Sequence, residues 1–396
     1  MSEMKISRIN NLLIFFLIAL SGSVFHVGFF SATYLLGLLF TTYVLLSKKS
    51  YDVKQLYIFV ASLFFFWSLF CLNFILSLSA DFKDYGVVIM QVFLSLLILL
   101  VLKIRGADIK FHLYFVLRFL IILSFIGFFL SIFKIGSLVV LGTEYNVYTI
   151  FFLFYYASEL QVGFLELFRN QGIFWEPGLL AIYANIFLLL SLFVYKNKQN
   201  SILAILCILT TASTTGLFIM LVQVLFFFRT RKFSLIQKTF LFLCAGLFSV
   251  LVLLSFTEKK VESEQKAVSS YGLRYFDLYS GTMVAVSNPV FGIGLNTNVF
   301  LKERDKFLTP EMIEIFSLIE YRNNSNSLLA LFYSLGLIFG TLWLFLLYKQ
   351  DLIKDQRKLF FFIAIVSFFS EPLVFTPFFY CFVFSGFQSL INFKYE

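Results

Sequence analysis

The chain has 396 residues, of which 60% are hydrophobic and only 13% are charged, and its formal net charge is +9. A soluble domain of this length cannot bury so much apolar surface, so the composition excludes a soluble globular protein. It predicts an all-α, polytopic integral membrane protein that forms one domain over residues 1–396. The four cysteines lie in apolar runs without a CxxC pair, and only two histidines are present. These features argue against a disulfide framework, a metal site and a Ser-His-Asp triad.

The first half of the chain predicts six membrane spans. Apolar runs of about 20 residues cross a bilayer, and Lys and Arg gather in cytoplasmic connections. The first run, Asn11 to Phe30, is too long for the apolar part of a signal peptide, so we expect it to be retained. Lys5 and Arg8 precede this run, which predicts a cytoplasmic N-terminus. The six predicted spans lie at 11–29, 31–46, 56–77, 86–102, 111–133 and 177–195, with a periplasmic segment over 134–175 before the last.

The apolar stretch 201–228 has basic residues at both flanks, so a single crossing would place positive charge on both sides of the membrane. Its middle reads Thr210-Thr-Ala-Ser-Thr-Thr-Gly216, which is a polar break. Two short helices that meet at this break would return both flanks to the cytoplasmic side. The alternative is one long tilted helix in which the Ser and Thr side chains bond back to the helix backbone.

Beyond this stretch, a span at 239–256 leads to a second periplasmic segment over 257–323, and a span at 324–348 returns to the cytoplasm. The last apolar stretch, 359–392, contains Glu371-Pro372 and Pro377, which predict another out-and-back pair. The sequence thus predicts about 12 transmembrane elements, two large periplasmic loops and two cytoplasmic termini. The positive net charge then belongs to the predicted cytoplasmic segments and does not require an acidic partner.

The segment from Arg169 to Gly178 (Arg-Asn-Gln-Gly-Ile-Phe-Trp-Glu-Pro-Gly) has two interpretations. In the first interpretation the segment is an ordinary helix start, because Pro177 suits the first helical position and Glu176 faces the positive end of the helix dipole. Trp175 would anchor that helix end at the membrane interface. A helix start does not need Arg169, however, and this arginine favours a functional site.

Two further arginines, Arg274 and Arg322, also lie in predicted periplasmic segments beside apolar or amphipathic stretches. Guanidinium groups bind phosphate oxygens through two hydrogen bonds, stay charged and lose water more easily than the Lys ammonium. Arg169, Arg274 and Arg322 at one membrane surface therefore predict a site for a diphosphate leaving group. The sequence has no DxD motif and no Walker loop, which argues against a metal-dependent sugar-nucleotide transferase and an ATPase.

Several pieces of the sequence resemble Wzy-type O-antigen and capsule polymerases, within the O-antigen polymerase and ligase superfamily. The pattern Arg-x-x-Gly-x-x-x-Glu-Pro-Gly over 169–178 resembles their central motif, and the polar break at 210–216 resembles a helix break of the superfamily. Arg274 followed by Asn288-Pro-x-x-Gly292-x-Gly294 is similar to their second large external loop, and Glu371-Pro372 to their final helices.

One departure from the superfamily pattern favours a polymerase over a ligase. O-antigen ligases carry a His in the external segment before the corresponding late helix, whereas this chain reads Asn323-Asn324-Ser325-Asn326 there. Taken alone, Asn324 also fits ordinary helix capping, and Gly292 and Gly294 fit a helix stop and turn.

The resemblance implies a glycosyltransferase of the bacterial inner membrane that lengthens O-antigen or capsule polysaccharide. It would transfer the growing glycan from undecaprenyl diphosphate to the next lipid-linked repeat unit, with inversion and without a cofactor or metal. The expected partners are this lipid-linked oligosaccharide, membrane lipids and a chain-length regulator protein, with no nucleic acid. The alternatives are an O-antigen ligase, a flippase or other transporter of the lipid-linked units, and a structural subunit without chemistry.

The resemblance also implies roles for individual residues. Arg169 and Arg274 would neutralise the developing diphosphate charge, and Glu176 would act as a base, orient the acceptor hydroxyl or hold Arg169. The remaining candidates for substrate binding are Arg322 and Asn324 on the acceptor side, together with Gly172, Trp175, Gly292 and Gly294.

Overall fold

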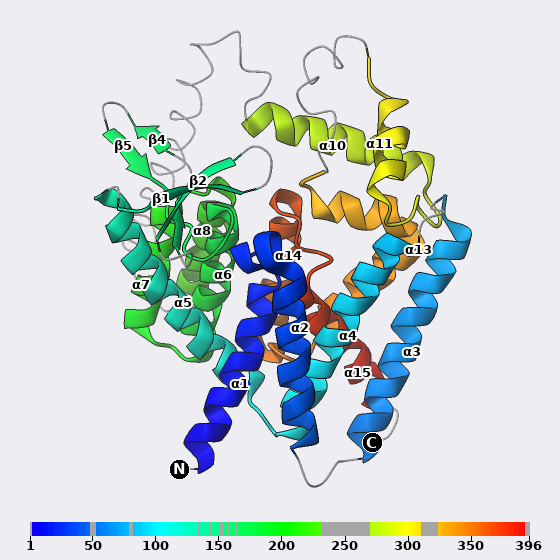
Figure 1. Ribbon diagram of the computed structural model, residues 1–396, viewed down its shortest axis with the longest axis horizontal. Helices are drawn as coiled ribbons and strands as arrows, with labels where there is room; N and C mark the ends of the chain where they lie inside the picture. The colour runs from blue at the N-terminus through cyan, green and yellow to red at the C-terminus, as the bar shows by residue number, and fades with distance from the viewer. Residues whose placement is uncertain are drawn as a thin grey trace.

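The computed structural model describes residues 2–47, 53–78, 82–133, 135–141, 145–150, 154–156, 159–162, 165–230, 270–309 and 324–392. This described part is mainly helical, and its helices form an upright bundle with five short strands and two further helices at one end (Figure 1). The predicted span at 239–256, Arg322 and parts of the predicted loop 257–323 lie outside the described residues.

Five helices in the described ranges are long and apolar enough to cross a membrane, which confirms a helical membrane protein in outline. They match the predicted spans at 56–77, 86–102, 111–133, 177–195 and 324–348. These helices are α3 (Val53–Leu76), α4 (Lys83–Ile104), α5 (Ile109–Ile132), α6 (Pro177–Leu189) with its π-helical continuation η1 (Leu190–Val194), and α13 (Ser327–Lys349).

The prediction of one continuous span at 11–29 is wrong. The apolar run divides into α1 (Ser2–Ala19) and α2 (Val24–Leu46), and the predicted span at 31–46 forms the greater part of α2. Gly22 between them has φ +122°, a conformation that favours glycine, and the Ser23 side chain accepts a hydrogen bond from Phe25 N at the start of α2. Apolar periodicity does not reveal a turn of this kind, because the turn is stabilised by a distant segment described below.

The strands lie in the segment that the sequence analysis placed in the periplasm. β1 (Ser137–Leu141), β2 (Tyr145–Ile150) and β3 (Phe154–Tyr156) form one antiparallel sheet in that order, and β4 (Glu159–Val162) pairs with β5 (Leu165–Phe168). β5 ends immediately before Arg169, so the second hairpin leads directly into the predicted motif.

The bundle is organised around α6, whose residues are all buried. A helix that is apolar on every side and buried on every side is typical of the centre of a membrane bundle. α6 packs against α5, α14 (Arg357–Ser370), α7 (Lys198–Thr211) and α8 (Thr214–Thr230). Asn185 of α6 is buried, donates to Gly216 O of α8 at 3.0 Å and accepts a hydrogen bond from Gln223 Nε2 at 2.9 Å, which joins α8 to α6.

The predicted break in the stretch 201–228 is present between α7 and α8, where Ala212 has the left-handed φ of 47°. The two helices run in opposite directions along α6. The end of α7 meets the segment before α6, since Asn170 N donates to Thr210 O at 2.9 Å. The end of α8 lies beside η1, where the rings of Phe193 and Phe226 are 5.7 Å apart. Both basic flanks therefore lie at the same end of α6, as the hairpin interpretation requires.

The second half of the described chain contains α10 (Ser270–Ser287), α11 (Thr297–Asp305), α13, the short 3-10 turn η4 (Lys354–Gln356), α14 and α15 (Pro377–Asn392). α10 and α11 lie at the same end of the bundle as the strands (Figure 1). The last apolar stretch divides into α14 and α15 at residues 371–376, so the predicted break is present, while the out-and-back crossing of the membrane stays a prediction.

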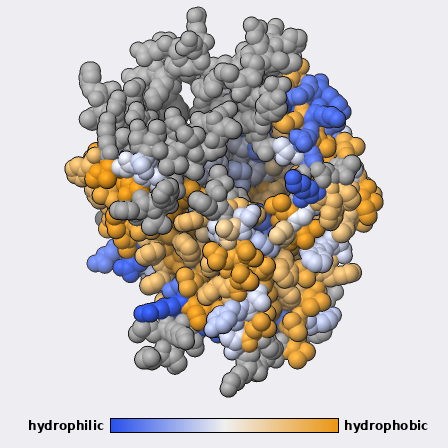
Figure 2. Space-filling view, in the orientation of Figure 1, coloured by the Kyte–Doolittle hydropathy of each residue, from blue (hydrophilic) through white to orange (hydrophobic). Residues whose placement is uncertain are grey.

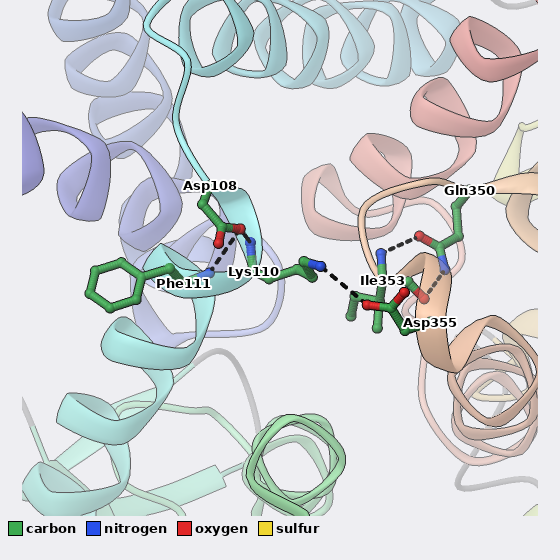
Figure 3. A network of polar contacts seen from close by, with 6 residues as sticks. All are labelled: Asp108, Lys110, Phe111, Gln350, Ile353 and Asp355. Atoms are coloured by element: carbon green, nitrogen blue, oxygen red, sulfur yellow. Dashed lines mark hydrogen bonds and ion pairs between the residues drawn. The ribbon is translucent and has the colours of Figure 1, made fainter. Parts of the chain in front are cut away.

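A polar network joins the α4–α5 connection to the α13–α14 connection (Figure 3). Lys110 Nζ pairs with Asp355 at 3.3 Å, and Gln350 bonds to the backbone N–H and C=O of Ile353. Asp108 caps the start of α5 by accepting from Lys110 N at 3.1 Å. The two connections that the sequence analysis placed in the cytoplasm thus lie side by side.

The sides of the bundle present apolar residues. In Figure 2 the middle of the visible face is mostly hydrophobic, and hydrophilic residues gather towards its upper right and lower left. Exposed large apolar side chains occur along α2, α3 and α5. Such an apolar belt is expected of a surface that contacts lipid.

Candidate functional site

The motif at 169–178 forms a tight turn followed by the start of α6. Pro177 occupies the first helical position, and Glu176 is the N-cap residue, with extended backbone and no capping hydrogen bond from its side chain. The predicted helix start is therefore confirmed. Gly172 has φ +57°, and a Cβ there would lie 2.9 Å from Ser124 Cβ, so glycine is required for both conformation and space.

The turn is held by the segment between α1 and α2. Val24 N donates to Ile173 O at 2.9 Å, and Trp175 N donates to Gly22 O at 3.3 Å. This pairing explains why the first apolar run divides near Gly22, because the broken backbone finds its hydrogen bonds in a segment about 150 residues away in the sequence. Trp175 is half-buried and packs against the bundle core, so its contacts are those of an anchored helix start.

Arg169 reaches across to the break between α7 and α8. Its Nε donates to Thr211 O, at the end of α7, at 2.9 Å. A guanidinium near the last carbonyls of a helix is favourable, because these carbonyls lack partners within the helix. Burial lowers the pKa of Arg169, while Glu176 and Glu371 raise it and Arg274 lowers it. Arginine nevertheless keeps its charge in proteins.

Arg274 lies on α10 and reaches the start of α8 from the other side of the break. Its Nη1 donates to Thr215 Oγ1 at 3.3 Å. Ser213 caps α8, because its side chain accepts from Gly216 N at 3.3 Å. The start of α8 thus combines the positive end of a helix dipole, two threonine hydroxyls and a guanidinium, which are groups that bind an anion.

A pocket of about 270 Å³ opens beside Arg274, between α8 and α14. Its walls combine hydroxyl groups with apolar side chains, so that one ligand could place a polar and an apolar part in it. The lining residues are Thr214, Thr215, Phe218, Arg274, Val366, Phe369 and Ser370.

Glu371 is a residue of this site that the sequence analysis did not select. It follows α14 directly, is only 4% exposed, and its Oε1 lies over Gly178 in the first turn of α6. Its side chain is hydrogen-bonded to that of Glu176, and both Arg169 and Arg274 act on its charge. The signal in the sequence was an isolated carboxylate within an apolar stretch, since an ionisable residue there marks a functional or paired site.

Two arginines and two glutamates from three separate segments, the turn before α6, α10 and the end of α14, therefore meet beside the pocket. We call Arg169, Glu176, Arg274 and Glu371 the four-residue cluster. Of the three residues predicted to be catalytic, the structure brings all three into this cluster. The arrangement can bind an anion through the guanidinium groups and offers a carboxyl group as proton acceptor.

The predicted substrate-binding glycines have another set of contacts. Gly292 and Gly294 both have positive φ, and their loop docks where α13 is kinked at Gly336. Gly294 N donates to Ser334 O at 3.0 Å, and a Cβ on Gly292 would collide with the backbone of α13. Their contacts give these glycines a structural role at the junction of α10 and α13, while their contact with a substrate stays a prediction.

Asn324 is buried and holds the segment before α13 against α10. It donates to Asp277 O at 2.7 Å and accepts from Asn326 N at 2.8 Å. Asp277, which the sequence analysis did not select, also accepts from Ser325 N at 3.1 Å. Because Asp277 is one helical turn from Arg274, this contact fixes the helix that carries the arginine.

In the part of the chain that the structure describes, no group of three or more His, Cys, Asp or Glu residues is arranged to hold a metal ion. No family model, curated protein or solved structure matches this chain.

Proposed function

We propose that this protein is a membrane polysaccharide polymerase of the Wzy type. It transfers the growing glycan from undecaprenyl diphosphate to the next lipid-linked repeat unit. The observation that carries this proposal is the meeting of Arg169, Arg274 and Glu176 beside a pocket at one end of an apolar helical bundle. Two guanidinium groups suit a diphosphate, and an apolar bundle suits a substrate that is anchored in lipid.

The reaction requires a leaving group, a nucleophile and a proton acceptor. The acceptor hydroxyl oxygen attacks the anomeric carbon of the donor from the face opposite the diphosphate, which inverts that carbon. The bond between the anomeric carbon and the diphosphate oxygen breaks, and its electron pair remains on the diphosphate. Arg169 and Arg274 neutralise this developing charge, and the carboxylate of Glu176 accepts the hydroxyl proton.

The topology proposed for this activity has about twelve transmembrane elements in the bacterial inner membrane, with both termini in the cytoplasm. The four-residue cluster then faces the periplasm, where lipid-linked repeat units are joined. Support comes from two pairs of helices, α7–α8 and α14–α15, each interrupted at a polar or proline-containing break. The pairing of Lys110 with Asp355 joins two of the proposed cytoplasmic connections.

Deletion of the gene tests this proposal in a host that attaches its glycan to lipid A-core. A polymerase is needed only to lengthen the glycan, so the deletion should leave core capped with a single repeat unit. The plasmid-borne gene should restore the full ladder, and Arg274→Ala at normal protein level should not. In a host that exports a free capsule, the lipid-linked glycan is sized instead.

The rival functions give different patterns in the same experiment. Loss of a flippase would leave bare core, with repeat units retained on lipid that faces the cytoplasm. Loss of a ligase would also leave bare core, but with long polymer on its lipid carrier outside. Either pattern, or an unchanged ladder, would overturn the assignment as a polymerase.

A further inference from the structure

Glu371 is held rigidly although it lies between two helices. Its backbone N–H donates to Ser367 O at 2.9 Å, and its carbonyl accepts from Ser327 Oγ at 2.6 Å and from Leu373 N at 2.9 Å. The side chain lies against Gly178, where a Cβ would collide with Oε1. The Glu371 carboxyl group therefore has a fixed position beside the N-cap residue Glu176.

The hydrogen bond between the Glu176 and Glu371 side chains has a chemical requirement. An ionised carboxylate only accepts hydrogen bonds, so two carboxyl groups can bond to each other only when one of them carries a proton. Two ionised carboxylates in contact would also repel each other strongly, which is the reason such pairs share one proton.

The surroundings place this proton on Glu371. Glu371 is 4% exposed, whereas Glu176 is partly exposed and acts more strongly on the charge of Arg169 than Glu371 does. Burial and the neighbouring Glu176 raise the pKa of Glu371 well above its ordinary value of 4.5, while Arg274 and Arg169 lower it. Among the described residues, Glu176, Arg274 and Arg169 are the charged groups that act on Glu371.

We propose that Glu371 is a positioning residue that shares one proton with Glu176 and thereby keeps the Glu176 carboxylate ionised and correctly oriented. Its effect on glycan transfer rests on the proposed function. The proton also determines the charge of the site. With both glutamates ionised, the four-residue cluster would carry no net charge, whereas with one shared proton it carries a net charge of +1 and attracts a diphosphate.

The infrared spectrum of the purified full-length protein in detergent tests the shared proton without any substrate. At about pH 7, ordinary Asp and Glu side chains are ionised, so a band from a protonated carboxyl group identifies an unusual residue. We expect this band in the wild type and its loss in Glu371→Gln. Asp355→Asn is the matched control, because it removes an exposed carboxylate in the α13–α14 connection, and this variant should keep the band.

The variant Glu176→Gln distinguishes a proton that Glu371 shares with Glu176 from a proton that Glu371 holds only because it is buried. In this variant the bond between two carboxyl groups is lost while the burial of Glu371 remains, so the band should shift in frequency or disappear. A band of unchanged frequency in Glu176→Gln would overturn the shared proton, and so would the absence of a band in the wild type. Neither result depends on whether the protein is a polymerase.

The glycan ladder tests the positioning role. A glutamine at position 371 can still donate a hydrogen bond to Glu176, so Glu371→Gln should retain most of the polymer, whereas Glu371→Leu should lose it. Gly178→Ala, which displaces the carboxyl group but keeps it, should shorten the chains at normal protein level. Loss of polymer in Glu371→Gln at normal protein level would overturn the positioning role, since the proton would then have to leave Glu371. An unchanged ladder in the gene deletion would refute the polymerase and leave the infrared result intact.

Discussion

Replacing Arg169 by lysine tests whether the site needs the shape of a guanidinium or only a positive charge. Arg169 bonds through Nε to Thr211 O at 2.9 Å while its charge acts on Glu176 and Glu371. A single ammonium on a flexible stem cannot reproduce the planar fork. A hydrogen bond that involves a charged group contributes about 1.5–3 kcal/mol. If that amount is lost from the transition state, transfer slows by about 10- to 150-fold.

We therefore expect Arg169→Lys to shorten the glycan nearly as severely as Arg169→Ala, with both proteins present at normal level. Arg105→Lys is the matched control, because Arg105 also bonds through Nε, to Asn10 Oδ1 at 2.8 Å, but outside the four-residue cluster. This control should keep full-length polymer even if its melting temperature falls. Full-length polymer in Arg169→Lys would reduce this arginine to a generic positive charge and refute the reasoning.

Two further predictions concern packing and topology. A methyl group at Gly386 would collide with backbone atoms of α13, which cannot rotate away, so Gly386→Ala should destabilise the protein in detergent by about 1–3 kcal/mol. Gly86→Ala, which has no neighbouring atom within 4 Å and lies in α4, should leave stability unchanged or raise it by up to about 1 kcal/mol, and a loss equal to that of Gly386→Ala would contradict this packing. In a variant without native cysteines, cysteines at Lys198 and Arg229 should resist a membrane-impermeant reagent in intact cells and react after lysis. Reaction of either position in intact cells would contradict the cytoplasmic hairpin.

Local signals in the sequence predicted many of the helix boundaries correctly. Pro177 marks the start of α6, because proline fits the first helical position, and the Ser/Thr cluster at 210–216 marks the break between α7 and α8. Long apolar runs predicted the five candidate spans, because a bilayer requires a fixed length of apolar helix. These signals act within one or two helical turns and can be read without knowing the fold.

The turn near Gly22 and the kink of α13 at Gly336 could not be predicted in this way. Both depend on a partner segment that is distant in the sequence. The first pairs with residues 173–175, and the second accepts the loop at 289–294. A glycine within an apolar run is compatible with a continuous helix, and only the docking segment supplies the hydrogen bonds that a broken helix loses.

The candidate site likewise combines features that local sequence predicts with features that depend on contacts between distant segments. Residue chemistry alone singled out Arg169, Arg274 and Arg322, because guanidinium groups beside apolar helices suit a diphosphate, and the resemblance to polymerases gave Glu176 its role. Only the tertiary structure joined Arg169, Arg274 and Glu176 to Glu371 and gave the two carboxyl groups a shared hydrogen bond. The physical reason is that the charge state of a carboxyl group depends on burial and on its neighbours, and both arise when α14 packs against the first turn of α6.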